Sequence, residues 1–172
     1  MNELIRFFWG LCLLRRTPGD LPRSPWLLQL VLLFNLAVNG FLGVTVFGAL
    51  TPAFLAALVE LALSAGLLFA ALQVRGRAQR WQQAYTALLG AGVVLGVIAL
   101  GYRSLLAVLG LGSPAVPDLM LFFWSLLVMA HVLRHSLEIR LGPAILIVIA
   151  YTMFLFGLIA QWFAPELVTQ GP

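Results

Sequence analysis

The sequence predicts an all-α integral membrane protein with five transmembrane helices preceded by an N-terminal interfacial helix. Of its 172 residues, 62% are apolar and only 9% are charged, and the mean hydropathy is +1.04. A water-soluble domain of this length leaves a large share of its area exposed and cannot hide so much apolar surface. Long apolar runs separated by short arginine-containing stretches complete the pattern.

Residues 1–23 are the first predicted segment, an interfacial amphipathic helix followed by a turn. Residues 1–14 are too few to cross a bilayer, which takes about 20 apolar residues in a helix. Polar or small residues at positions 2, 3, 6 and 10 recur at helical spacing among aromatic and aliphatic ones. This pattern is typical of a short helix in the headgroup plane. The TPGD that follows is expected to form a type II turn.

Residues 24–172 are the second segment, a bundle of five spans. The apolar runs that predict these spans cover about residues 26–50, 53–74, 84–101, 118–138 and 143–163. Residues 102–117 are mostly apolar but too short to cross, so we expect them to be interfacial or re-entrant.

Helix-start signals support these boundaries. Ser24-Pro25 combines a serine N-cap with a proline at the first helical position. Thr51-Pro52 is expected to repeat this device after a tight turn, so that the first two spans form an antiparallel hairpin. Asp118 is expected to cap the fourth span.

The arginines predict the orientation. Five spans place the two chain ends on opposite sides, and nine of the ten basic residues, all arginines, then lie on one side. Cytoplasmic loops carry an excess of such residues, so we expect a bacterial inner-membrane protein with a cytoplasmic N-terminus and a periplasmic C-terminus. Two clusters on that side are predicted to contact anionic membrane lipids or a partner's acidic face: Arg15, Arg16, Arg23 and Arg75, Arg77, Arg80. Their dispersal between apolar segments does not indicate nucleic-acid binding.

An intramembrane polar cluster is predicted within the first two spans. Glu60 lies inside the second span, with Ser64 one turn later, and Asn35 and Asn39 share a face of the first. Charged groups in hydrocarbon are costly and need a role. One hypothesis is a proton- or cation-binding carboxylate. The hypothesis we favour is interhelical stabilisation, with Glu60 hydrogen-bonded to Asn39 or to a partner subunit.

The stretch HVLRHSLEIR places His131, His135 and Glu138 on one face at the end of the fourth span. Two histidines at i and i+4 are able to ligate a metal or to titrate near neutral pH. The ligand set is sparse, and Glu138 is able to pair with Arg134. We therefore interpret the stretch as a polar helix exit and predict no metal and no cofactor. His131 is expected to hydrogen-bond across helices, with Tyr151 and Thr152 as candidate partners.

Gly92 and Gly96 in the third span form a small-xxx-small pattern. Small residues at this spacing let two helix backbones approach closely. We therefore predict that this face packs against another span or against a second protein.

No catalytic motif is apparent in the sequence, and the loops are too short for a soluble catalytic domain. We predict a non-enzymatic accessory, scaffold or assembly subunit of a larger inner-membrane complex, with other membrane subunits or a second copy as partners. The rival hypothesis is a small transporter or channel that uses Glu60 with Asn35 and Asn39. A metal or redox protein based on His131 and His135 ranks third.

The opening FFWGLCLLRRTPGDLPRSP resembles the start of small uncharacterised proteobacterial inner-membrane proteins. The predicted topology is also similar to that of the Yip1-type five-span proteins. That second similarity covers the spans only and carries no matching motif, so it implies no functional residue.

Overall fold

The computed structural model describes residues 2–110 and 112–163. Within them the chain forms six α-helices and two short 3₁₀ helices and no strand. In chain order these are α1 (Asn2–Cys12), η1 (Pro18–Asp20), α2 (Pro25–Phe47), α3 (Leu50–Val74), η2 (Ala78–Arg80), α4 (Trp81–Leu109), α5 (Ala115–Leu137) and α6 (Leu141–Phe163). Helices α2 to α6 are each long and apolar enough to cross a membrane. The all-α class and the five candidate spans are therefore confirmed.

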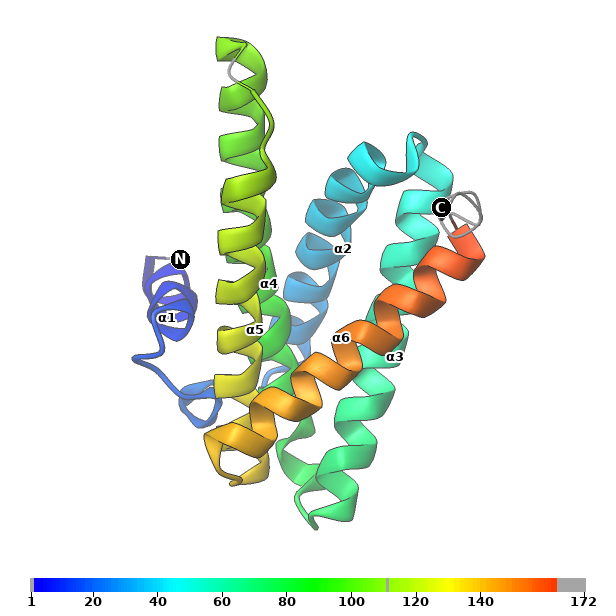
Figure 1. Ribbon diagram of the computed structural model, residues 1–172. Helices are drawn as coiled ribbons and strands as arrows, with labels where there is room; N and C mark the ends of the chain where they lie inside the picture. Colours follow the sequence, from blue (N-terminus) through cyan, green and yellow to red (C-terminus); the bar gives the residue numbers. More distant parts are fainter. Residues whose placement is uncertain (1, 111, 164–172) are drawn as a thin grey trace.

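The five long helices form two diverging arms (Figure 1). Helices α4 and α5 run side by side as one arm, and α2 and α3 form the other. The arms lie closest near the end that holds the loops after α3 and α5, and they separate toward the opposite end. Helix α6 begins near the C-terminal end of α5 and crosses α3 obliquely. The predicted polar cluster lines a cavity to which all five of these helices contribute.

The apolar core fills the narrow part between the arms. Its buried members come from α2, α3, α4 and α5, and they include Leu27, Val31, Leu61, Leu68, Leu72, Leu89, Val128 and Val132. Two glycines let α2 and α4 cross closely. A methyl group at Gly96 would lie 2.4 Å from Val38 Cγ1, and one at Gly92 would lie 2.7 Å from Asn35 Nδ2. The small-xxx-small face thus packs within this chain.

Helix α1 shares this core. Leu11 and Cys12 are fully buried, and the Phe8 ring packs on Gly90, where a methyl group would lie 2.1 Å from the ring. The segment 1–23 is therefore attached to the bundle through α4. Its position at the membrane interface stays a prediction.

Cys12 ties α1 to both helices of one arm. Its thiol donates to the Ala91 carbonyl at 3.8 Å, and its own carbonyl accepts from Trp124 Nε1 at 2.8 Å. Burial raises the pKa of this thiol to about 11. The thiol is therefore neutral at ordinary pH and acts as a packing group.

The predicted re-entrant segment 102–117 is wrong. Its first half continues α4 to Leu109, and α5 begins at Ala115. Arg103 suggested a break, but its guanidinium is paired with Asp118 in the structure. The stop signal is Gly110, whose φ of 63° forms a left-handed C-cap.

Two other predicted boundaries also move. The turn between α2 and α3 lies at Gly48-Ala49, where Gly48 has φ 69°, and Pro52 lies in the first turn of α3. A proline is tolerated there because the first turn leaves its N–H groups unpaired. Asp118 likewise lies within the first turn of α5 and does not cap it.

Of the two remaining predicted local signals, the Ser24 N-cap is confirmed and the TPGD type II turn is not. Ser24 caps α2 as predicted, since the Leu27 N–H donates to its hydroxyl at 3.3 Å. The TPGD stretch forms η1 with a Thr17–Asp20 capping box. Gly19 is not among the residues with positive φ, so the type II turn was wrong.

Candidate functional site

A cavity of about 530 Å³ lies between the two arms, and α2, α3, α4, α5 and α6 all line it. Most of its wall is apolar, with leucines, valines, Phe122 and Met129. Its polar lining residues are Asn35, Asn39, Glu60, Ser64, Tyr102, Arg103, Asp118, Ser125 and Tyr151. A cavity of this size, mostly apolar with a few converging polar groups, is typical of a small-ligand site.

The structure brings the predicted polar cluster together in this cavity but pairs its members differently. Asn39 Nδ2 donates to Asn35 Oδ1 at 2.9 Å and to the Asn35 carbonyl at 3.1 Å. Asn35 Nδ2 in turn donates to the Leu89 carbonyl of α4 at 3.0 Å. The two asparagines therefore bridge α2 to α4, and the predicted hydrogen bond from Glu60 to Asn39 is not formed.

Ser64 also bonds elsewhere. Its hydroxyl donates to the Leu61 carbonyl at 3.0 Å and lies 3.4 Å from the Tyr85 hydroxyl. The Tyr85 hydroxyl donates to the same Leu61 carbonyl at 2.7 Å. This small network joins α3 to α4 and leaves Glu60 without a hydroxyl donor from either residue.

Glu60 is the least constrained polar group in the cavity. Its side chain is exposed on the cavity wall and makes no hydrogen bond or ion pair within residues 2–110 and 112–163. It lies ten residues into α3, which at 1.5 Å per residue is roughly 15 Å from the helix start. A carboxyl group at about half the thickness of a bilayer therefore faces a cavity with none of its hydrogen-bonding capacity used.

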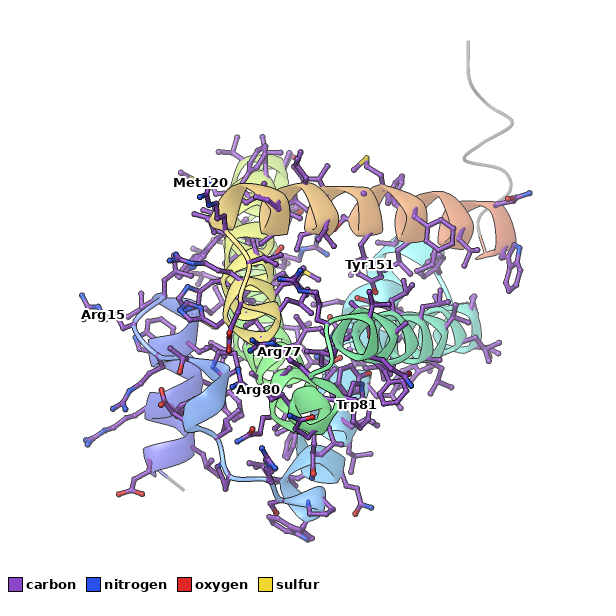
Figure 2. The ribbon with its side chains drawn as sticks, turned by 90° about the horizontal axis from the view of Figure 1, so that it is seen from below. Arg15, Arg77, Arg80, Trp81, Met120 and Tyr151 are labelled. Atoms are coloured by element: carbon purple, nitrogen blue, oxygen red, sulfur yellow. The ribbon has the colours of Figure 1, made fainter. Side chains whose placement is uncertain are left out.

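Two tyrosine hydroxyls in the same cavity are also unpaired. Tyr102 on α4 and Tyr151 on α6 are buried at their hydroxyl oxygens, and neither has a hydrogen-bond partner within the described part of the chain. Figure 2 shows Tyr151 extending from α6 toward α3. Glu60 and Ser64 line the same cavity, and neither makes a hydrogen bond to this hydroxyl. The predicted partnership of Tyr151 with His131 is wrong.

Sequence reasoning missed Tyr102 as a cavity residue because it was placed in the re-entrant segment. Tyr151 carried a usable signal, since it and Thr152 interrupt an otherwise apolar run. Nothing in the sequence, however, indicates that α6 crosses α3 at that level.

A charged cluster spans the wide end of the cavity. Arg103 Nε and Nη2 donate to the two carboxylate oxygens of Asp118 at 3.0 and 2.9 Å. Arg103 Nη1 donates to Thr45 Oγ1 on α2 at 2.8 Å. One guanidinium thus links the ends of both arms, and its charge is balanced by Asp118.

The HVLRHSLEIR stretch does not line this cavity. His131 Nε2 donates to the Arg16 carbonyl at 2.9 Å, and His135 Nδ1 donates to the His131 carbonyl at 2.8 Å, because a carbonyl only accepts. Each imidazole is thereby engaged with backbone. The described residues include no cluster of three histidine, cysteine, aspartate or glutamate side chains suited to a metal.

Glu138 pairs across the bundle and not along α5. Its carboxylate forms ion pairs with Arg77 and with Arg80, whose Nη1 donates at 2.8 Å. Figure 2 shows these two arginines near the ends of α4 and α5. The predicted Arg134 pair fails because α5 ends at Leu137, so Glu138 has left the helix with φ 50°. The hydrogen bond from Arg77, followed by that from Arg80, holds the pKa of Glu138 below its usual value.

No protein family, curated protein or solved structure matches this chain.

Proposed function

We propose that this protein is a small, non-enzymatic inner-membrane carrier that binds an organic cation in the cavity between its arms. The observation that carries the proposal is the convergence of three unused polar groups on one cavity: the Glu60 carboxyl and the hydroxyls of Tyr102 and Tyr151. This proposal adopts the transporter hypothesis and extends it to a chemical class of ligand.

The cost of unpaired polar groups motivates a bound ligand. Hydrocarbon offers no hydrogen bonds. Moving a polar group from water into it without a hydrogen-bond partner therefore costs about 2–7 kcal/mol. Native proteins rarely leave such groups unpaired without a functional reason. Three in one cavity support a role in which water and a ligand complete their hydrogen bonds.

The chemistry of the wall favours a cation. Glu60 supplies a carboxyl group, and the tyrosine hydroxyls and the Asn39 amide oxygen add neutral acceptors. The one arginine on the wall, Arg103, is neutralised by Asp118. Apolar side chains cover the rest of the wall, which suits a ligand with an apolar body, such as a substituted ammonium ion.

The distribution of arginines supports an N-in, C-out orientation. Nine of the ten basic residues lie in α1, in the loops before α2 and between α3 and α4, or in the last turn of α5 and the loop that follows it, which gathers most of them at the end of the bundle where α2 and α4 begin. By the positive-inside rule this end faces the cytoplasm. The wide end of the cavity, where Arg103 and Asp118 lie, would then face the periplasm.

Charge selectivity tests the proposal. The full chain would be purified in a nonionic detergent, and quenching of its tryptophan fluorescence would be titrated with tetraphenylphosphonium and with tetraphenylborate. These probes have the same shape and opposite charge. We expect saturable binding of the cation and at least about tenfold weaker binding of the anion, a difference of about 1.4 kcal/mol. Equal binding of both probes would mean that the cavity binds apolar molecules without selecting their charge, and it would contradict the proposal.

The accessory-subunit hypothesis rests on apolar faces that the fold leaves uncovered. The side chains of Phe156 and Leu146 on α6 are 72% and 69% exposed. In a bilayer, lipid tails cover such faces as well as a partner helix does. These faces favour neither hypothesis, whereas the polar cavity favours the carrier.

A further inference from the structure

A separate, smaller cavity of about 370 Å³ lies at the arginine-rich end of the bundle. Its wall is built from four separate parts of the chain: the η1 turn, Arg23 just before α2, Arg80 and Gln83 at the start of α4, and His135 near the end of α5. The proposed carrier function does not use it. Three spans thus end around one polar pocket.

The charged residues in the wall of the pocket are both basic, and one of them, Arg80, is ion-paired with Glu138 outside the wall. Arg23 and Arg80 both line it, and none of its lining residues is an aspartate or glutamate. The nearby Asp20 carboxylate accepts from the backbone and hydroxyl of Thr17. The pocket therefore brings two guanidinium groups together without an acidic residue in its own wall.

Both guanidinium groups keep unused donors. Arg23 donates from Nε to Gln83 Oε1 at 3.4 Å and makes no other hydrogen bond within the described residues. Arg80 uses Nη1 for Glu138 at 2.8 Å, which leaves its Nε and Nη2. Gln83 holds the wall in place by donating to the Leu21 carbonyl at 2.6 Å.

His135 adds a third nitrogen to the wall. Its Nδ1 donates to the His131 carbonyl at 2.8 Å, so Nε2 is the remaining polar atom of the ring. The wall therefore offers one imidazole nitrogen beside the two guanidinium groups.

We propose that this pocket binds a phosphate group through Arg23 and Arg80. The planar guanidinium donates two parallel hydrogen bonds to phosphate oxygens, which makes arginine well suited to this ligand. The pocket lies where α2 and α4 begin and α5 ends, and phospholipid phosphates would lie at this level if these helices span a bilayer. Basic pockets between spans on the cytoplasmic side commonly bind anionic headgroups.

The test measures binding by calorimetric titration of the purified full chain in a nonionic detergent. The two titrants are inorganic phosphate and dihexanoylphosphatidylglycerol. Arg23→Gln and Arg80→Gln each remove one guanidinium of the pocket. Arg77→Gln is the matched control, because Arg77 also pairs with Glu138 but does not line the pocket. Arg15→Gln is a second control, since Figure 2 shows Arg15 extending outward from the molecule.

We expect saturable binding that both pocket variants weaken by about tenfold or more, the scale of a lost charge-assisted hydrogen bond, while both controls bind as the wild type does. Binding of the lipid alone identifies a headgroup site, and binding of both probes identifies a site for free phosphate. A folding check by size-exclusion chromatography accompanies each variant, and Arg23→Lys replaces any glutamine variant at position 23 that fails it. Absence of saturable binding, or equal weakening by Arg15→Gln, would overturn the proposal.

Discussion

Glu60 on α3 and Tyr151 on α6 face the same cavity, and neither side chain has a hydrogen-bond partner among residues 2–110 and 112–163. The two residues lie near the middle of their helices. Other polar groups of this region, such as Asn35 and Tyr85, donate to backbone carbonyls and stabilise the packing. The contrast separates polar groups that hold the helices together from polar groups that remain available to a ligand.

Tyr151→Phe is expected to leave stability unchanged or slightly raised, because the lost hydroxyl has no partner. It should weaken binding of a primary ammonium ligand such as 2-phenylethylammonium, whose N–H groups can donate to the hydroxyl, by about two- to tenfold, the value of one hydrogen bond. Tyr85→Phe is the matched control. Its hydroxyl donates to Leu61 at 2.7 Å, so its loss should lower stability by about 1 kcal/mol. Thermal unfolding in detergent and fluorescence titration measure both effects, and a strongly destabilised Tyr151→Phe would show that this hydroxyl is structural.

Gly96→Ala is expected to destabilise the bundle by about 1–3 kcal/mol, the usual cost of overpacking. Its added methyl would lie 2.4 Å from Cγ1 of Val38, a short and stiff side chain. Gly66→Ala serves as the control, because nothing lies within 4 Å of the added atom there. Unfolding temperatures of the two variants compare the sites directly. Equal temperatures would mean that α2 and α4 do not cross closely at Gly96.

Asp118→Asn is expected to loosen the wide end of the cavity. The substitution removes the charge that holds Arg103 between Asp118 and Thr45. A cysteine at Ser125, on the cavity wall, should then react faster with a hydrophilic maleimide in a Cys12→Ala background. A cysteine at Ser113, in the loop between α4 and α5, should react at the same rate with and without Asp118→Asn. No change at position 125 would mean that this ion pair does not hold the wide end of the cavity together.

The Glu138 ion pairs predict a pH dependence. Arg77 and Arg80 hold the pKa of Glu138 below its ordinary value of 4.5, so folding favours the carboxylate. Its contribution to stability is complete above the unfolded-state pKa and is lost as the pH falls through the lower folded-state pKa. Unfolding temperatures measured from pH 7 down to pH 3 should therefore fall more steeply for the wild type than for Glu138→Gln. Parallel curves would mean that these ion pairs do not stabilise the fold.

The five helices were predictable because apolar length is a property of the sequence alone. The extent of α4 was not, because Tyr102 and Arg103 look like a helix break until Asp118 and Thr45 are seen to pair with Arg103. A charge inside an apolar run does not reveal whether a partner on another helix will neutralise it.

Several polar residues that line the cavity were predictable, but their hydrogen-bond partners were not. Asn35, Asn39, Glu60 and Ser64 do converge, since hairpin geometry sets their approximate depth. Their partners depend on how far each helix is rotated about its axis, which packing decides. Backbone partners are also invisible in a sequence, as shown by His131, whose ring donates to the Arg16 carbonyl.

The most direct test of the carrier proposal is the dissociation constant of tetraphenylphosphonium for Glu60→Gln. The amide keeps the size of the side chain and removes its charge. We expect this variant to fold and elute as the wild type does, because Glu60 makes no hydrogen bond or ion pair within the described residues. Its dissociation constant should rise by about tenfold or more, whereas Glu3→Gln, on the exposed side of α1, should bind normally. Wild-type affinity in Glu60→Gln would contradict the proposal, and failure of this variant to fold would return Glu60 to a structural role.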